Sequence, residues 1–374
     1  MKLFDVYPLY NVTPVSAKGI VVTDDKGQDY LDFYGGHAVI SIGHTHPHYV
    51  QRLKDQLDKI GFYSNAVQNP LQEELAKKLG VISKCEDYNL FMCNSGAEAN
   101  ENALKMASFA TGKSKIIAFN NGFHGRTSAA VAVTDNPSIN AEINQQHEVV
   151  FLDLNDIKGF EREISKNVCA VIIESIQGVG GLDEPTTEFL QKVAALCKEN
   201  DALLIADEVQ SGFGRSGKFF GFQHHNIQPD IISIAKGMGN GFPVGGVLIH
   251  ENIKAKYGML GTTFGGNHLA CVATLAVLEV IENENLIANA EELGIYFNEK
   301  AKEIPQVKRV KGKGLMLGLE FDFQVADLRK KLIHEHHLFT GGAKDKTVLR
   351  VLPALNITKQ DLDVFFTALK TALS

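Results

Sequence analysis

The sequence predicts an α/β protein with two units: a large domain built on a mostly parallel sheet, and a smaller α+β domain assembled from the two chain ends. Two observations predict this division. Short apolar runs of strand length alternate with stretches of helical periodicity through the middle of the chain, whereas hairpin-like and mixed patterns occupy the ends. A chain of 374 residues is long enough for two such units.

Apolar runs in the central region are predicted strands, and their lengths suit a parallel sheet that is covered on both faces. They span Asn89 to Cys93, Lys115 to Phe119, Val149 to Leu152, Cys169 to Glu174, Ala202 to Ala206, Ile231 to Ala235 and Val244 to Ile249. Between the fourth and fifth runs, apolar side chains from Leu190 to Cys197 recur at helical spacing. Strand, helix and strand in that order predict a right-handed parallel crossover.

The chain ends carry the predicted smaller domain. Ile20 to Leu31 is a predicted hairpin, with its turn at Asp24 to Gly27. The C-terminal region has predicted helices at Leu269 to Ile281, Val325 to His337 and Lys359 to Leu373, and predicted strands at Gly314 to Glu320 and Thr347 to Leu352. We expect residues 1–50 and 268–374 to build the small domain, residues 51–267 to build the large one, and a ligand to bind between them.

Composition narrows the function and the setting. A net charge of −7 and a pI near 6.0 argue against nucleic acid or an anionic membrane as the main partner. The five cysteines form no CxxC pair and lie mostly inside apolar runs, which is typical of reduced core residues. The first residues lack an apolar signal core, and no apolar run is long enough to cross a bilayer. We therefore expect a cytoplasmic protein.

Two predicted strands are each followed by an ionisable side chain: Asp207 comes after Ala206, and Lys236 comes after Ala235. Ligands of parallel sheets bind beyond the carboxyl ends of the strands, so both side chains are expected in one cleft. Pyridoxal 5′-phosphate requires this pair, because the amine bonds to its aldehyde and the carboxylate keeps its pyridine nitrogen protonated. The alternative is that both are ordinary solvated strand-end residues.

A phosphate site is predicted at Ser95-Gly96-Ala97, which follows a predicted strand and begins a helix. Ser95 with Glu98 matches a capping box, and the small residues after Ser95 leave the first-turn NH groups uncovered. Such NH groups and the helix dipole favour an anion. A capped helix without a ligand is the alternative.

Two further segments are candidates for ring stacking and carboxylate binding. In the loop from Asn120 to Thr127, Phe123 is placed to stack on a flat ring and Arg126 to hold a carboxylate in a bidentate pair. Arg350 lies between apolar neighbours of a predicted strand and therefore needs a partner. A core phenylalanine, a surface arginine and a structural ion pair are the respective alternatives.

Together these segments resemble the class III, fold type I aminotransferases that use pyridoxal phosphate, most closely the acetylornithine, succinylornithine and ornithine branch. The resemblance runs nearly from end to end. It rests on Gly43 to Pro47, Asn94 to Asn100, Phe123 to Arg126, Glu174 to Gly181, Asp207 to Gln210, Ala235 to Gly237 and Gly261 to Asn267, in the family's order. The implied fold is a seven-stranded, mostly parallel sheet flanked by helices, with a smaller α+β domain.

The resemblance implies a role for each matching residue. Lys236 is implied as the catalytic lysine and proton shuttle, Asp207 as the partner of the pyridine nitrogen, Gln210 as a donor to the ring oxygen and Phe123 as the stacking ring. The other implied cofactor contacts are Ser95, Gly96, Ala97, Glu174, Glu208, Val209 and Thr263, of which Thr263 reaches the cofactor of the neighbouring subunit in a homodimer. The implied substrate contacts are Arg126, Thr262 and Arg350.

This chain departs from the family pattern at three positions. Ser175 and His268 replace prolines, and Val179 replaces a glutamate that in relatives pairs with the arginine that Arg350 resembles. A valine cannot form that pair, so we expect Arg350 to stay available to anions. The hypothesis is that both half-reactions use a substrate with a carboxylate near Arg350, which disfavours free ornithine.

The predicted activity is the transfer of the δ-amino group of N2-acetyl-L-ornithine to 2-oxoglutarate in arginine biosynthesis. N-succinylornithine, ornithine or another ω-amino acid are alternative donors, and a succinyl group needs a further cation that the sequence does not place. An aminomutase and a cofactor-binding regulatory protein are rivals of other kinds, although no basic face suits the latter. The histidines at 44, 46 and 48 sit around Pro47, a setting that does not suit a metal site.

Overall fold

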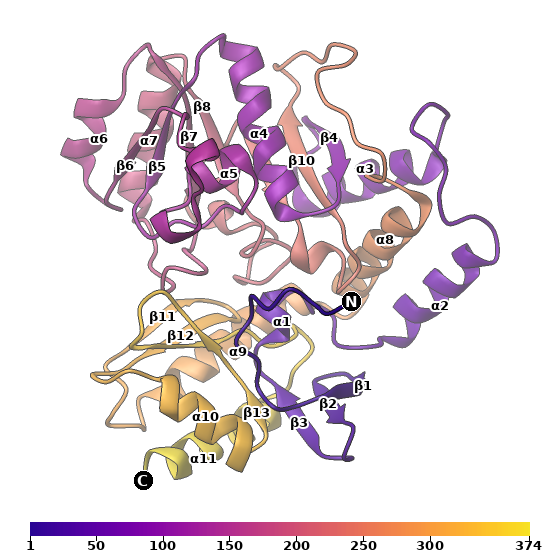
Figure 1. Cartoon of the computed structure of the whole chain (residues 1–374), viewed down its shortest axis with the longest axis vertical. Coiled ribbons are helices and arrows are strands. Elements are labelled where there is room, and N and C mark those ends of the chain that lie inside the picture. Colours follow the sequence, from indigo (N-terminus) through magenta and orange to yellow (C-terminus); the bar gives the residue numbers. More distant parts are fainter.

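The computed structural model describes residues 1–374 and contains three sheets, one in the upper part of Figure 1 and two in the lower part. The upper sheet has the strand order β4-β10-β9-β8-β7-β5-β6. Its strands are β4 (Tyr88–Cys93), β5 (Lys115–Phe119), β6 (Val149–Leu152), β7 (Val168–Glu174), β8 (Leu203–Asp207), β9 (Ile231–Ile234) and β10 (Gly245–His250). All seven predicted central strands are therefore confirmed. Only β10 runs against its neighbours β4 and β9.

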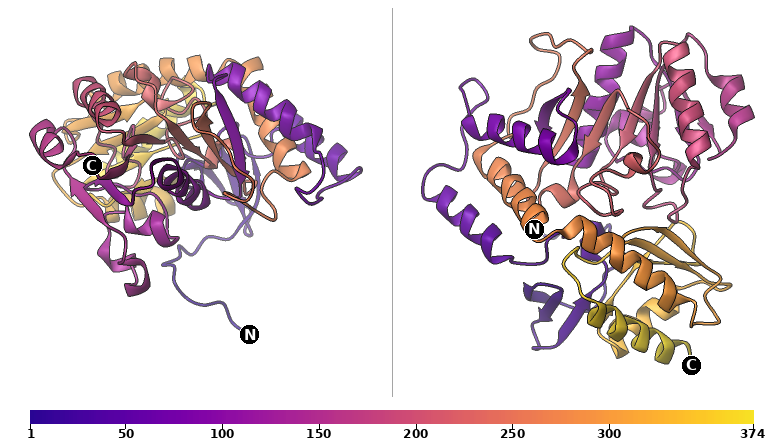
Figure 2. Two further views of the ribbon diagram at one scale, coloured as in Figure 1. Left: turned by 90° about the horizontal axis from the view of Figure 1, so that it is seen from above. Right: turned by 180° about the vertical axis from the view of Figure 1, so that it is seen from behind.

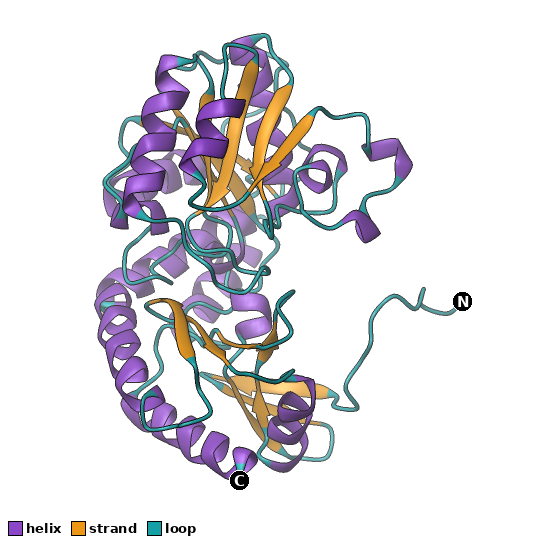
Figure 3. Cartoon of the chain, turned by 90° about the vertical axis from the view of Figure 1, so that its left-hand side faces the viewer, coloured by secondary structure: helices purple, strands orange, loops and turns teal.

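Helices cover both faces of this sheet, which explains why its strands are continuously apolar. In β5, Ile116 and Ala118 pack with Ala103 and Leu104 of helix α4 (Gly96–Thr111). The intervening Ile117 and Phe119 pack on the opposite face with α6 (Ile157–Glu163) and α7 (Thr187–Glu199). Since successive strand side chains point to opposite faces, one five-residue run contributes to both cores. The views in Figures 2 and 3 show these helical layers from other sides.

The N-terminal sheet joins the two ends of the chain. Its order is β1-β2-β3-β13, with β1 (Pro14–Lys18), β2 (Val21–Asp24), β3 (Asp29–Asp32) and β13 (Leu338–Phe339). Val21 pairs with Leu31 across the β2–β3 hairpin, which confirms the hairpin predicted there. The pairing of β13 with β3 is parallel and brings a segment from near the C-terminus alongside the N-terminal hairpin. The domain bounds at residues 50 and 267 stay a prediction.

The third sheet has the order β11-β12-β15-β14. Its strands are β11 (Arg309–Lys313), β12 (Met316–Glu320), β14 (Gly341–Gly342) and β15 (Val348–Val351). The strand predicted from Gly314 begins two residues too early, because Gly314 has φ 56° and lies in the turn between β11 and β12. A left-handed turn residue cannot be part of the regular strand.

The three predicted C-terminal helices are confirmed and differ from their predictions only at their ends, whereas the other remaining helices were not predicted. The last two begin near the predicted residues: α10 (Ala326–Glu335) stops before His337, which has φ 55°, and α11 (Lys359–Leu373) matches its prediction. Helix α9 (Leu286–Ala301) was not predicted. The others are α1 (Gly35–Ala38), α2 (Pro47–Leu57), α3 (Pro70–Ser83), α5 (Ser128–Ala132) and α8 (His268–Asn283), with short 3-10 turns at Pro137–Ile139, Glu142–Asn144, Gly221–His224 and Lys236–Met238. None of the helices combines the length and apolar character that spanning a membrane requires.

The segment before α2 is tied to the loop that follows β9. The Asn240 side chain accepts hydrogen bonds from the backbone N of Ser41 and of Ile42 at 2.9 and 3.1 Å, and donates to the carbonyl O of Gly43 at 3.0 Å. The Ser41 hydroxyl donates to the carbonyl O of Gly237 at 2.6 Å. The N-terminal segment therefore supports the backbone that presents Lys236.

Candidate active site

A cavity of about 420 Å³ lies at the carboxyl ends of the parallel strands, where the sequence predicts the site. β7 ends in Glu174 and β8 ends in Asp207, and both side chains line this cavity. The other predicted residues that line it are Ser95, Gly96, Ala97, Phe123, Arg126, Val209, Gln210 and Lys236. The structure thus brings together residues from five separate segments of the chain.

Lys236 is presented from a 3-10 turn just after β9 and has φ 46°. A left-handed backbone at a residue with a side chain stores strain, which is typical of functional sites. Burial lowers the pKa of its amine and the positive charge of Arg350 adds to this, while Asp207 and Glu174 oppose it. The resulting direction favours a neutral amine, which is the form that acts as a nucleophile or accepts a proton.

The Asp207 carboxylate is held by buried donors. Oδ2 lies 2.7 Å from Nδ1 of His124 and accepts a 2.7 Å hydrogen bond from Nδ2 of Asn100, while Oδ1 accepts from the backbone N of Val209. Although burial opposes it, the hydrogen bond and charge of Asp207 raise the pKa of His124, with a contribution from Glu174. The imidazole therefore favours its cationic form, which stabilises an ionised Asp207 in one orientation.

Glu174 fixes the loop that carries Phe123. Its carboxylate accepts hydrogen bonds from the backbone N of Phe123 at 2.9 Å and of Gly178 at 2.8 Å. Burial raises the pKa of Glu174 to about 7 and the negative charge of Asp207 also raises it, against the opposing effects of His124 and the two NH groups. Glu174 is therefore a positioning residue for the loop as well as part of the cavity wall.

The predicted phosphate site begins α4. Ser95 is the N-cap, and its hydroxyl accepts a 3.2 Å hydrogen bond from the backbone N of Glu98. The capping box is incomplete, because the Glu98 carboxylate bonds to the backbone N of Asn94 rather than to that of Ser95. A Cβ at Gly96 would lie 2.6 Å from Cγ1 of Val209, so this position requires a residue without a side chain.

The candidate substrate-binding residues do not all line this cavity. Arg126 is exposed at the cavity, whereas Thr262 and Thr263 line a neighbouring cavity of about 460 Å³. The two cavities share Asn94, whose Nδ2 donates to the Thr262 hydroxyl at 3.3 Å. Arg350 of β15 lies behind the wall, where its Nη1 donates at 2.7 Å to the carbonyl O of Gly178, next to the cavity-lining Val179.

Glu208 does not line the cavity, although it was predicted to contact the cofactor. Its buried carboxylate accepts hydrogen bonds from the hydroxyls of Ser175 and Ser211 and from the backbone N of Gly221 and Phe222, at 2.7 to 2.9 Å. A strand alternates its side chains, so the neighbour of cavity-lining Asp207 points to the other side. Four donors give Glu208 a structural role.

Two polar residues at the site were not predicted. His124 follows Phe123 directly, and its buried place beside Asp207 depends on the loop conformation rather than on any spacing in the sequence. Asn100 bridges Asp207 and the Ser233 hydroxyl from inside α4. The sequence feature that could have identified Asn100 is its position as a polar residue on the apolar face of a helix, because a buried polar side chain needs a hydrogen-bond partner.

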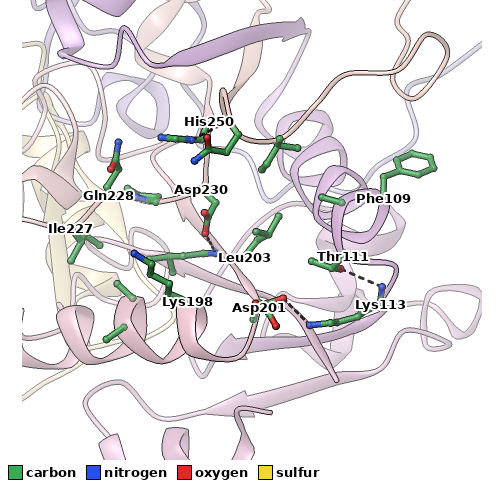
Figure 4. A pocket seen from close by; sticks show the side chains of 18 of the residues that line it. Phe109, Thr111, Lys113, Lys198, Asp201, Leu203, Ile227, Gln228, Asp230 and His250 are labelled. Atoms are coloured by element: carbon green, nitrogen blue, oxygen red, sulfur yellow. Dashed lines mark hydrogen bonds between the residues drawn. The ribbon is translucent and has the colours of Figure 1, made fainter. Parts of the chain in front are cut away.

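A larger cavity, of about 1040 Å³, lies elsewhere (Figure 4). It surrounds Leu203 and Asp230, at the amino ends of β8 and β9 and thus at the opposite edge of the sheet from Asp207. Lys113 in its wall donates to backbone carbonyls, including that of Asp201 at 2.7 Å. None of the predicted site residues lines this cavity.

Comparison with known proteins decides the family. The family described as Aminotransferase class-III matches residues 6–373. The chain belongs to the class-III aminotransferases. The acetylornithine aminotransferases of Bacillus subtilis and Aquifex aeolicus are each 40% identical to it, covering 100% and 99% of this chain and 97% and 99% of their own lengths.

Solved structures agree with this class-III fold. The ornithine aminotransferase of Toxoplasma gondii superimposes with a TM-score of 0.90 at 28% identity, covering 98% of this chain and 91% of its own. The ornithine delta-aminotransferase of Plasmodium falciparum gives 0.84 at 31% identity, covering 98% and 94%. Another structure of the Toxoplasma enzyme is described with partial occupancy of PLP at its active site. The predicted fold class is confirmed, and the chain is a PLP-dependent aminotransferase.

The cavity residues of this aminotransferase fit pyridoxal 5′-phosphate. The side-chain amide of Gln210 lies in the wall, and its buried Oε1 has no hydrogen-bond partner, so the cavity presents an amide that is not fully paired within the protein to a ligand. The first-turn backbone NH groups of α4 are uncovered and suit a phosphate. Lys236, whose pKa is lowered, faces the same cavity as the Asp207 carboxylate, which His124 holds in place. When bound, the cofactor supplies an electron sink for the carbon next to the substrate nitrogen.

Proposed function

We propose that the protein transfers the δ-amino group of N2-acetyl-L-ornithine to 2-oxoglutarate, giving N-acetylglutamate semialdehyde and glutamate, in arginine biosynthesis. The observation that carries the proposal is Lys236 and Asp207 in one cavity, in a chain whose full-length relatives are named acetylornithine aminotransferases. N-succinylornithine and ornithine remain alternative donors, and ornithine aminotransferases are among the similar structures. An aminomutase, which shares the lysine and the aspartate, is the less favoured reading.

Each residue has a proposed role that its position supports. Lys236 holds the cofactor and moves the proton at the reacting carbon, and such positioned proton transfer is typically worth about 10² to 10⁴ in rate. Asp207, oriented by His124, pairs with the pyridine nitrogen. Ser95, Gly96 and Ala97 hold the phosphate through backbone NH groups, while Phe123 covers the ring and Gln210 donates to the ring oxygen.

The substrate is held by its charges in this proposal. Arg126 at the cavity and Arg350 behind its wall bind the two carboxylates of 2-oxoglutarate, which is the reason why two guanidinium groups are needed. Thr262 contacts the acyl group from the neighbouring cavity.

A cytoplasmic homodimer with shared sites is part of the same proposal. Thr263 is exposed and lies outside its own chain's 420 Å³ cavity, as a residue serving a second subunit would. Around it, Phe62, Tyr63 and Phe264 expose large apolar side chains, at 44%, 59% and 60%. Contiguous exposed aromatic residues mark protein interfaces.

Adding single amino donors to the purified holoenzyme tests the activity. Acetylornithine should remove the visible absorbance of the lysine-bound cofactor, and 2-oxoglutarate should restore it with release of glutamate. Ornithine at the same concentration is the matched comparison. Persistent absorbance together with an isomer of the donor as product would instead identify an aminomutase.

A further inference from the structure

A loop of the third sheet reaches the wall of the active-site cavity. It joins β14 to β15 and contains Lys344 and Asp345. The backbone N of Lys344 donates to the carbonyl O of Val179 at 2.8 Å, and the backbone N of Asp345 donates to that of Gly180 at 3.1 Å. Since Val179 lines the cavity, this loop holds one part of the cavity wall directly.

The segment held in this way packs in turn against the loop that carries Phe123 and Arg126, which also line the cavity. A Cβ at Gly180 would lie only 2.6 Å from the carbonyl O of Asn121, so the two backbones can approach this closely only at a glycine. Three backbone layers are therefore stacked at this side of the site, with the segment around Gly180 in the middle.

The side chain of Lys344 reaches past the middle layer to a residue that supports the third. Its Nζ donates to Oδ2 of Asp135 at 2.6 Å and to the carbonyl O of Asp135 at 2.9 Å. The two side chains are 44% and 27% exposed, so water screens the pair only in part. Lys346 in the same loop forms no ion pair, and its Nζ donates to the carbonyl O of Ala343 at 3.4 Å.

Asp135 uses the same carboxylate oxygen to hold the loop just before Phe123. Oδ2 accepts from the backbone N of Asn121 at 2.7 Å, and the backbone N of Asp135 donates to the carbonyl O of Gly122 at 3.0 Å. Burial raises the pKa of Asp135, but the hydrogen bond and charge of Lys344 and the NH of Asn121 outweigh it, so this pKa lies below its ordinary value. An ionised carboxylate is the stronger acceptor for that NH.

Two carboxylates therefore fix this loop from different sides. Glu174 accepts from the backbone N of Phe123, and Asp135 accepts from that of Asn121 two residues earlier. Loss of either acceptor would allow the loop to shift. A shift of about 1 Å in a group that positions a substrate can cost up to about 10² in rate.

We propose that Lys344 is a positioning residue, which acts through Asp135 on the loop that carries Phe123. The loop then places Phe123 against the cofactor ring and Arg126 against a carboxylate of the 2-oxo acid. The inference rests on the proposed function for these two roles, and it is independent of which amino donor the enzyme uses. Lys344 itself contacts the protein alone.

Amide hydrogen exchange in the cofactor-free protein tests the effect on the loop. Lys344→Met keeps the length of the side chain and removes its charge, so exchange within residues 120–127 should become about fivefold faster, the upper range for a partly exposed ion pair. Lys344→Arg should retain the wild-type exchange. Lys346→Met is the matched control from the same loop and should leave exchange unchanged.

Two measurements on the holoenzyme test the consequence for the reaction. Lys344→Met should raise the KM for 2-oxoglutarate and the dissociation constant of the cofactor by about fivefold each. It should lower kcat by less than about twofold, because Lys236 and Asp207 are unchanged. Asp135→Asn should have the same effects, and the double variant should be no worse than either single one, since all three lack the same ion pair.

The outcomes separate this inference from the proposed function. Wild-type exchange in Lys344→Met, or faster exchange with wild-type KM and cofactor affinity, would overturn the positioning role. A uniform increase in exchange over the whole chain, or additive losses in the double variant, would also overturn it. A wild-type enzyme that transfers no amino group from any acylornithine would overturn the proposed function, and exchange within residues 120–127 together with cofactor affinity would still decide the role of Lys344.

Discussion

Nδ1 of His124 lies 2.7 Å from Oδ2 of Asp207, and both side chains are almost completely buried. The same carboxylate oxygen accepts from Asn100, so two donors from different elements fix it. The aspartate therefore reaches the cavity with its orientation already set, and its pairing with a ligand requires no rearrangement. Preorganised charges of this kind are most effective where water is excluded.

Breaking that pair should produce a pH-dependent loss of stability. Because the pKa of His124 is raised in the folded state, its stabilisation is fully present below the ordinary histidine pKa and is lost as pH rises through the raised pKa. His124→Gln should lower the free energy of unfolding by about 3 kcal/mol at pH 6 and by less at pH 9. Urea unfolding of the cofactor-free protein measures this. His147→Gln, at an exposed position, should show no such trend; an equal loss at both pH values would argue against a charged His124.

Lys236→Ala should abolish turnover and leave cofactor binding weak but detectable. The variant removes the amine that holds the cofactor and carries the proton, and it leaves the phosphate site at Ser95 to Ala97 unchanged. Single-turnover kinetics and equilibrium dialysis with the cofactor measure the two effects. Lys218→Ala is the control, because Lys218 is exposed and its Nζ lies 3.9 Å from its ion-pair partner, Oε1 of Glu291. Sustained turnover by Lys236→Ala would refute the assignment.

Val179→Glu should raise the rate with ornithine relative to acylornithine, by about tenfold. A carboxylate beside Arg350 would neutralise that buried cation when the donor brings no carboxylate to it, and one such ion pair is worth a factor of this order. The ratio of kcat/KM for the two donors is the measurement. Val179→Gln tests whether size alone matters. Unchanged ratios in Val179→Glu would count against the role of Val179 in selecting the donor.

Glu208→Ala should destabilise the protein by about 3 kcal/mol, because it leaves two hydroxyls and two backbone NH groups without their acceptor. The bound-cofactor spectrum should keep its wild-type position, since Glu208 does not line the cavity. Chemical unfolding and absorption spectra of the same samples separate the two effects. Glu161→Ala, an exposed carboxylate paired with Lys192, should be nearly neutral. A shifted spectrum with unchanged stability would restore the predicted cofactor contact.

The seven-stranded sheet could be predicted from the sequence, because its strands are short apolar runs whose side chains must be buried on both faces of the sheet. Asp207 and Lys236 were found by the same logic, since the residues after parallel strands share one edge. Their functional roles, and the domain bounds, stay predictions. The direction of β10 was not predictable, because an apolar run has the same periodicity in either direction.

What sequence reasoning missed depends on contacts between distant segments. Asn100 lies inside α4, and only the folded structure brings its amide to Asp207 of β8 and Ser233 of β9. Glu208 was misplaced for the opposite reason: it adjoins a cavity residue in the chain but points to the other side of the strand. Adjacency in sequence is a poor guide to the direction of a side chain at a strand end.

The hydrogen bonds from Asn240 to the segment around Ser41 set an order of events during synthesis. The partners are 199 positions apart in the chain, and β3 further waits for β13 at residue 338. At ordinary translation speeds the N-terminal hairpin spends about 10 to 40 s outside the ribosome before Asn240 is even made. The contacts that support the backbone around Lys236 therefore cannot form before residue 240 is made, and the N-terminal sheet is completed only after residue 338.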